Sequence, residues 1–168
     1  MMDKIDLYDI DKMPTGRIDT HPSEGEYRLV IHLCIFSGDK MLIQRRSETC
    51  QKWAGLWDVT LSGCAIAGEK GRDAAMRELK EELGLDIDLT GVRPALTVSF
   101  ATGFDEVFLT ERNVDISSLT LQREEVCQVK WATLEDILAL RENGEFTPFT
   151  PEYLKLLFFM KDKNDVME

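Results

Sequence analysis

The sequence lacks long apolar runs and any excess of positive charge. Its longest apolar stretches, residues 29–36 and 154–160, are far shorter than the roughly 20 residues that span a bilayer. Lys and Arg number 20 against 31 Asp and Glu, which gives a formal net charge of −11. This charge disfavours binding to nucleic acid polymers and to anionic membranes. We therefore expect neither as a partner.

Paired cysteines are also missing. The four cysteines, at positions 34, 50, 64 and 127, form no C-x-x-C pair, so neither a zinc site nor a disulfide scaffold is expected. The N-terminal stretch MMDKIDLYDIDK is acidic and has no apolar centre, unlike a signal peptide. These features predict a cytoplasmic protein with reduced thiols.

No internal repeat, low-complexity tract or linker divides the chain. Its 168 residues, of which 43% are hydrophobic, suit one domain with a real core. Residues 1–25 are polar and contain two prolines and two glycines. We expect them to form an extension or hairpin packed on a main domain of residues 26–168.

The apolar pattern predicts strands at residues 27–36, 41–46, 57–61, 94–100, 106–113 and 126–131. A helix is predicted at 73–83. A second starts at Thr133, where Asp136 allows a capping box, and a third starts at Thr150, where Pro151 suits the first helical position. Strands interleaved with helices predict an α/β fold with a mixed sheet covered on both faces.

The most informative segment is residues 63–85, GCAIAGEKGRDAAMRELKEELGL. On the predicted helix, Glu78, Glu81 and Glu82 project from neighbouring positions on one side. Like charges so placed repel, and a cation would remove that cost. Oxygen ligands that leave room for water suit Mg²⁺ or Mn²⁺ better than Zn²⁺. The spacing therefore predicts a magnesium or manganese site.

If the three glutamates are considered alone, an ordinary solvent-exposed helix face explains them as well as a metal site does. Gly84 would then be a plain C-cap, where a positive φ favours glycine. That interpretation does not explain Glu69, eight residues before Arg77. Lys70 and Gly71 precede the helix, and Gly71 is expected to act as a weak N-cap.

The spacing G-x5-E-x7-R-E-U-x-E-E-x-G-U, with U apolar, resembles the Nudix box, and every specified position matches. The likeness extends over residues 26–140, including LIQRRS at 42–47 and AGLWD at 54–58. The resemblance implies the Nudix α/β/α sandwich. It also implies a metal-dependent hydrolase that cleaves a nucleoside diphosphate linked to another group, or a related organic diphosphate.

The resemblance also assigns roles within the box. Glu78, Glu81 and Glu82 would hold Mg²⁺ or Mn²⁺, and the backbone carbonyl of Gly63 would complete the metal shell. Either Glu78 or a further residue, Glu125, would act as the general base. The resemblance implies two supporting residues. Arg77 would orient the site glutamates, and Glu69 would act as a supporting or secondary metal-binding group.

Four residues outside the box are candidates for contacting a small diphosphate substrate. Arg45 and Arg46 suit phosphate, although adjacent strand residues face opposite ways, so at most one reaches a given pocket. Trp53 and Phe104 suit stacking on a ring. His32 lies in an apolar strand, where a hydrogen-bonded core histidine is expected rather than a metal ligand.

Two other functions compete with hydrolysis. The long N-terminal segment resembles the Nudix branch that includes isopentenyl-diphosphate isomerase, which uses a Cys before the box glycine and a His after it. Here those places hold Ser62 and Cys64, which disfavours isomerisation. A catalytically silent sensor or interaction protein is disfavoured by the intact carboxylates. The substrate, the attacked phosphorus and the oligomeric state stay open.

Overall fold

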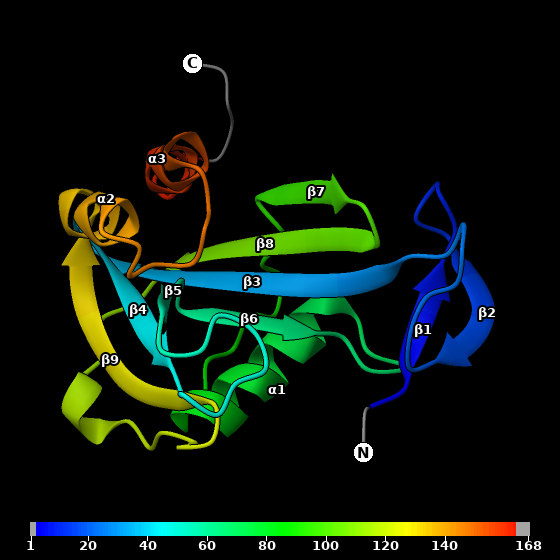
Figure 1. Ribbon diagram of the computed structural model, residues 1–168, viewed down its shortest axis with the longest axis horizontal. Coiled ribbons are helices and arrows are strands. Elements are labelled where there is room, and N and C mark those ends of the chain that lie inside the picture. The colour runs from blue at the N-terminus through cyan, green and yellow to red at the C-terminus, as the bar shows by residue number, and fades with distance from the viewer. Residues whose placement is uncertain (1–2, 164–168) are drawn as a thin grey trace.

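The computed structural model describes residues 3–163 and confirms the predicted α/β class. Within these residues, the main sheet has seven strands in the order β5-β4-β3-β8-β7, with β6 paired to β3 and β9 paired to β4. β3 and β8 are parallel and the other pairs are antiparallel, so the sheet is mixed (Figure 1). The strands are β3 (Arg28–Ser37), β4 (Lys40–Arg46), β5 (Trp57–Asp58), β6 (Leu61–Cys64), β7 (Leu96–Phe100), β8 (Gly103–Glu111) and β9 (Val126–Thr133).

Helices cover both faces of this sheet, as Figure 1 shows. They are α1 (Gly71–Leu83), α2 (Leu134–Glu142) and α3 (Pro151–Met160), with a short 3₁₀ turn, η1 (Ile116–Ser118). Thr133 and Asp136 form the predicted capping box of α2. Thr150 caps α3, which begins at Pro151 as predicted. No helix among residues 3–163 is both long and apolar enough to cross a membrane.

Two local predictions are wrong. The expected single strand 57–61 is divided, because β5 pairs with β4 while β6 pairs with β3. The N-cap of α1 is Lys70, with no side-chain bond, and Gly71 is the first helical residue. A Cβ at Gly71 would collide with the carboxylate of Glu106 on β8. Glycine at this position therefore permits close packing rather than capping.

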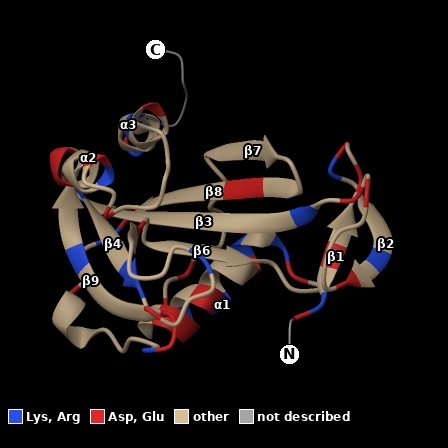
Figure 2. Ribbon diagram, viewed as in Figure 1, with Lys and Arg blue, Asp and Glu red and all other residues tan. Residues whose placement is uncertain are grey.

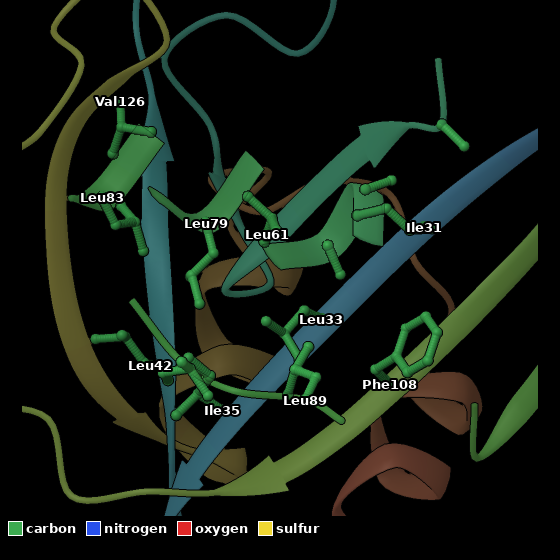
Figure 3. Close-up of a cluster of buried hydrophobic side chains, with 14 of the residues drawn as sticks. Ile31, Leu33, Ile35, Leu42, Leu61, Leu79, Leu83, Leu89, Phe108 and Val126 are labelled. Carbon is green, nitrogen blue, oxygen red and sulfur yellow. The ribbon is translucent and has the colours of Figure 1, made fainter. Parts of the chain in front are cut away.

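The core has two parts, one on each face of the sheet. Alternate residues of β3, Ile31, Leu33 and Ile35, pack with α1 in the cluster shown in Figure 3. Cys34 and Phe36, on the other face, pack beneath α2 and α3. The two C-terminal helices cover only the end of this second face. The beginning of β3 on that face stays open and lines a cleft.

An N-terminal hairpin packs beside the main sheet (Figure 1). Its strands, β1 (Ile5–Tyr8) and β2 (Pro14–Asp19), are antiparallel, and Tyr8 forms an isolated bridge to Tyr27. The Gly68 amide donates to Asp6 over 2.7 Å, and Lys12 pairs with Glu106. The hairpin therefore holds the loop that leads into α1.

Candidate active site

Acidic residues occur at several positions of α1, which is partly red in the ribbon of Figure 2. Gly63 on β6 lies directly against one of them, Glu78. A Cβ built on Gly63 would lie 2.9 Å from both Cγ and Cδ of Glu78, closer than real Cβ atoms approach. Only glycine leaves this space, so the strand and the carboxylate are in direct contact.

Arg77 connects three of the carboxylates. Its Nε and Nη2 donate to Glu69 over 2.7 and 3.0 Å, and its Nη1 lies 3.0 Å from both Glu78 Oε1 and Glu81 Oε2. Burial alone would raise the pKa of Glu69, but the hydrogen bonds from Arg77 bring it below its ordinary value. Glu69 is thereby held ionised beside the guanidinium.

Glu82 lies on the buried side of α1 and is 6% exposed. It accepts a 3.1 Å hydrogen bond from Gln44 Nε2. Burial raises the pKa of Glu82 to about 8, and the charges of Glu78 and Glu125 add to the effect. Burial also raises the pKa of Glu78, although Arg77 opposes the shift. These carboxylates therefore repel one another in a poorly solvated place.

The carboxylates are not gathered into a ready-made metal site. Among residues 3–163, no three His, Cys, Asp or Glu side chains are grouped so that they could hold an ion. Arg77 holds Glu78 and Glu81, while Gln44 holds Glu82. The donor set nevertheless fits a hard cation, because Glu78, Glu81 and Glu82 all offer carboxylate oxygens. The Oε1 atom of Gln44 is also buried without a partner among the described residues.

A cleft of about 1200 Å³ lies on the open half of the sheet. Gly63 and Glu125 line it at the box end. Arg46 also lines the cleft, and its Nη1 lies 3.9 Å from Asp58 Oδ2. Arg45 does not line it, and instead donates to the Gly55 carbonyl over 2.8 Å. Of the two arginines, the structure therefore places only Arg46 in the cleft.

The two aromatic candidates have different positions. Trp53 lines the cleft, is 52% exposed and has a φ of 55°, a strained value for a non-glycine residue. Phe104 belongs to the hydrophobic core and packs on Tyr27 with ring centroids 5.4 Å apart. A stacking role fits Trp53 and does not fit Phe104.

The cleft also contains groups that sequence reasoning missed. Nδ1 of His32 lies 2.5 Å from Asp105 Oδ2, and its ring meets Phe149 edge-on at 5.4 Å. Burial lowers the pKa of His32, but the hydrogen bond and the charges of Asp105 and Asp58 outweigh it, so the net shift is upward. His32 is hydrogen-bonded as expected, yet it lines the cleft. Only the parallel pairing of β3 with β8 brings it beside Asp105.

Fold and site together define an α/β/α protein in which a carboxylate-rich helix, none of whose residues lines the cleft, packs against Gly63, which does line it. The NUDIX domain model matches residues 26–153. The chain therefore belongs to the Nudix family and is a hydrolase that acts on pyrophosphate bonds.

Similar proteins include a Nudix hydrolase, an isomerase and a solved structure of the same fold. An uncharacterized Nudix hydrolase of Listeria innocua is 42% identical over 143 residues, covering 84% of this chain and 83% of that protein. An isopentenyl-diphosphate Delta-isomerase of Cereibacter sphaeroides is 29% identical over 151 residues, with 84% of each chain covered. A crystal structure of a Deinococcus radiodurans protein has a TM-score of 0.74 at 21% identity, covering 92% of this chain and 98% of that one. The last similarity shows the fold.

Proposed function

We propose that the protein is a Mg²⁺- or Mn²⁺-dependent pyrophosphohydrolase. Its substrate would be a nucleoside diphosphate linked to another group, or a related organic diphosphate. The observation that carries the proposal is the crowding of Glu78, Glu82 and Glu125, whose charges oppose one another, next to Gly63, which touches Glu78 and lines the cleft together with Glu125. A divalent cation bound there would compensate these charges and attract a diphosphate in spite of the net charge of −11.

Each box residue has a role in this proposal. Glu78, Glu81 and Glu82 would hold the ion, together with the carbonyl of Gly63. When bound, the ion neutralises phosphate charge and lowers the pKa of a bound water. Arg77 is a positioning residue, and its bidentate pair with Glu69 fixes the guanidinium.

Proton removal from the attacking water is assigned to Glu78 or Glu125. Glu125 lines the cleft, which gives it access to a water beside the substrate. Glu78 touches Gly63 from the other side of β6. Arg46 suits a contact with phosphate, and Trp53 suits a contact with a ring at the entrance of the cleft.

The direct test is a screen of organic diphosphates with Mg²⁺ and with Mn²⁺, followed by the variant Glu82→Gln. Glutamine keeps the size and the hydrogen bond to Gln44 but removes one ligand charge. We expect kcat/KM to fall by roughly 10²- to 10⁴-fold with little change in melting temperature. The control is Glu135→Gln in the exposed first turn of α2. Turnover of Glu82→Gln equal to that of the control would remove Glu82 from the site.

Isomerisation of isopentenyl diphosphate is the second candidate, favoured by the similarity to the Cereibacter enzyme. Two side chains that line the cleft, Ser62 and Cys64, disfavour isomerisation. Ser62 stands where the isomerase family has its Cys, and its hydroxyl lies 3.4 Å from Asp58 Oδ2. Burial raises the pKa of the Cys64 thiol, which stands where the family has a metal-binding His. Hydrolysis is therefore the better supported reaction.

A further inference from the structure

β7 forms an unpaired edge of the main sheet. It is the last strand in the order β5-β4-β3-β8-β7, and among residues 3–163 it pairs with β8 alone. Each residue from Thr97 to Phe100 is exposed, so this part of the strand is open to solvent. Alternate residues of an edge strand direct their backbone N–H and C=O groups away from the sheet. A further strand could therefore bind to β7.

This edge lacks the features that usually prevent two strands from associating. Natural edge strands are protected by charged side chains and by proline. The exposed strand β2 has such protection in Pro14, Arg17 and Asp19. Residues 95–101, by contrast, contain neither charge nor proline, and the ribbon of β7 is tan throughout in Figure 2. Of these two exposed strands, only β7 is suited to pairing.

The sequence of the edge has the same chemical order in both directions. Residues 95–101 read ALTVSFA, with Val98 at the centre. If two copies of this strand pair antiparallel about their centres, each valine faces the other valine. Moving outward, hydroxyl faces hydroxyl, a large apolar side chain faces another, and alanine faces alanine. Matched pairs of this kind stabilise antiparallel strands. The pairs are Thr97 with Ser99, Leu96 with Phe100, and Ala95 with Ala101.

The faces of the strand would also match. Val98 and Phe100 line the cleft and are 40% and 36% exposed, and Leu96 packs against the core beneath α2 and α3. Side chains alternate along a strand, so these three lie on one face of β7. Residues directly opposite one another in a sheet share a face. An antiparallel copy would therefore cover the exposed apolar side chains with its own.

This symmetry indicates which partner the edge fits. A strand of another protein requires no symmetry in β7, whereas a two-fold axis at Val98 requires matched residues on both sides of it. Each copy carries a formal net charge of −11, and the uncharged edge lets two copies meet without like charges directly opposite one another. A two-fold pair is also the commonest arrangement of soluble homo-oligomers. The fitting partner is therefore a second copy of this chain.

We infer that the protein forms a two-fold symmetric dimer in which β7 pairs antiparallel with β7 of a second copy, and Val98 faces the partner's Val98. The two main sheets then form one continuous sheet, with both clefts on the same side. Because Val98 and Phe100 line the cleft, the partner's Leu96 extends the cleft wall beside Phe100. The inference uses no residue of the box and goes beyond the proposed hydrolysis.

Analytical ultracentrifugation between about 1 µM and about 1 mM tests the dimer, since a small interface is expected to have a Kd in the micromolar range. The mass of wild type should rise from 19.2 kDa toward twice that value. Val98→Lys places two like charges opposite each other at the axis, and we expect it to raise the Kd at least about tenfold. The matched control, Ile18→Lys on the exposed strand β2, should dimerise like wild type. Wild type that stays monomeric at every concentration would overturn the inference and leave β7 to a strand of another protein.

A charge swap tests the register. Val98→Glu alone should weaken the dimer as Val98→Lys does, and an equimolar mixture of the two should restore it, because opposite charges then face each other. Both variants should keep the circular dichroism spectrum of wild type, since Val98 is exposed. A dimer that persists in both single variants would place the interface elsewhere and overturn the inference. A mixture no more dimeric than its two components would overturn the pairing of Val98 with the partner's Val98.

Discussion

At the scale of single residues, burial decides what each charged group of the cleft can do. The side chain of Glu81 is 54% exposed, whereas that of Glu78 is 18% exposed, although both lie on the helix side predicted from their spacing. Glu82 is more buried still. Sequence spacing places charges on a helix face, but burial depends on what packs against that face. The raised pKa values of Glu78 and Glu82 therefore cannot be predicted from the sequence.

The pKa of His32 provides a test at this scale. We expect it to lie above its ordinary value of about 6.5, because the bond to Asp105 and the nearby charges outweigh the effect of burial. The resulting contribution to stability is present below the unfolded pKa and is lost as the pH rises through the folded pKa.

NMR titration measures this value directly, since the chain has only two histidines, and His21→Asn assigns the signals. Asp105→Asn should lower the pKa of His32, because burial would then be less opposed. A titration of His32 that does not respond to Asp105→Asn would contradict the pairing seen in the structure.

At the scale of elements, β6 and α1 pack closely where Gly63 meets Glu78. Gly63→Ala would place a Cβ 2.9 Å from the Glu78 carboxyl carbon, so that the carboxylate must shift. We expect kcat/KM to fall at least tenfold, since small displacements at a reacting centre are costly. The melting temperature should change little, because the displaced atoms belong to the end of a flexible side chain. Wild-type kcat/KM in this variant would show that the contact between β6 and α1 is unnecessary.

Most elements could be predicted from sequence because their signals are local. The apolar run before Ser37, the cap at Thr133 and the proline at 151 each mark a boundary within a few residues. The pairing of His32 with Asp105 is not local, since 73 residues separate them. The glycine at position 71 was misread for a similar reason. Its packing partner, Glu106, comes from a distant strand.

At the scale of the whole molecule, the Nudix fold is compatible with both hydrolysis and isomerisation. The side chains that line the cleft therefore decide which reaction the protein catalyses. We predict no isomerisation of isopentenyl diphosphate. The isomerase uses a thiol, whose ordinary pKa is about 8.5, and the hydroxyl of Ser62 is a much poorer acid or base than a thiol. Incubation with isopentenyl diphosphate and Mg²⁺, followed by NMR, measures the rearranged alkene. Formation of dimethylallyl diphosphate at catalytic rates would make the isomerase the correct assignment.

The central claim is that the box carboxylates hold a divalent cation in the folded protein. Thermal unfolding in EDTA, and then in Mg²⁺ or Mn²⁺, tests this claim most directly. An ion at ten times its Kd stabilises the native state by about 1.4 kcal/mol, or about 3–6 °C for a chain of this size. Wild type should show this rise, and Glu82→Gln should show much less. Identical melting curves for wild type at all metal concentrations would contradict the account and favour a silent scaffold.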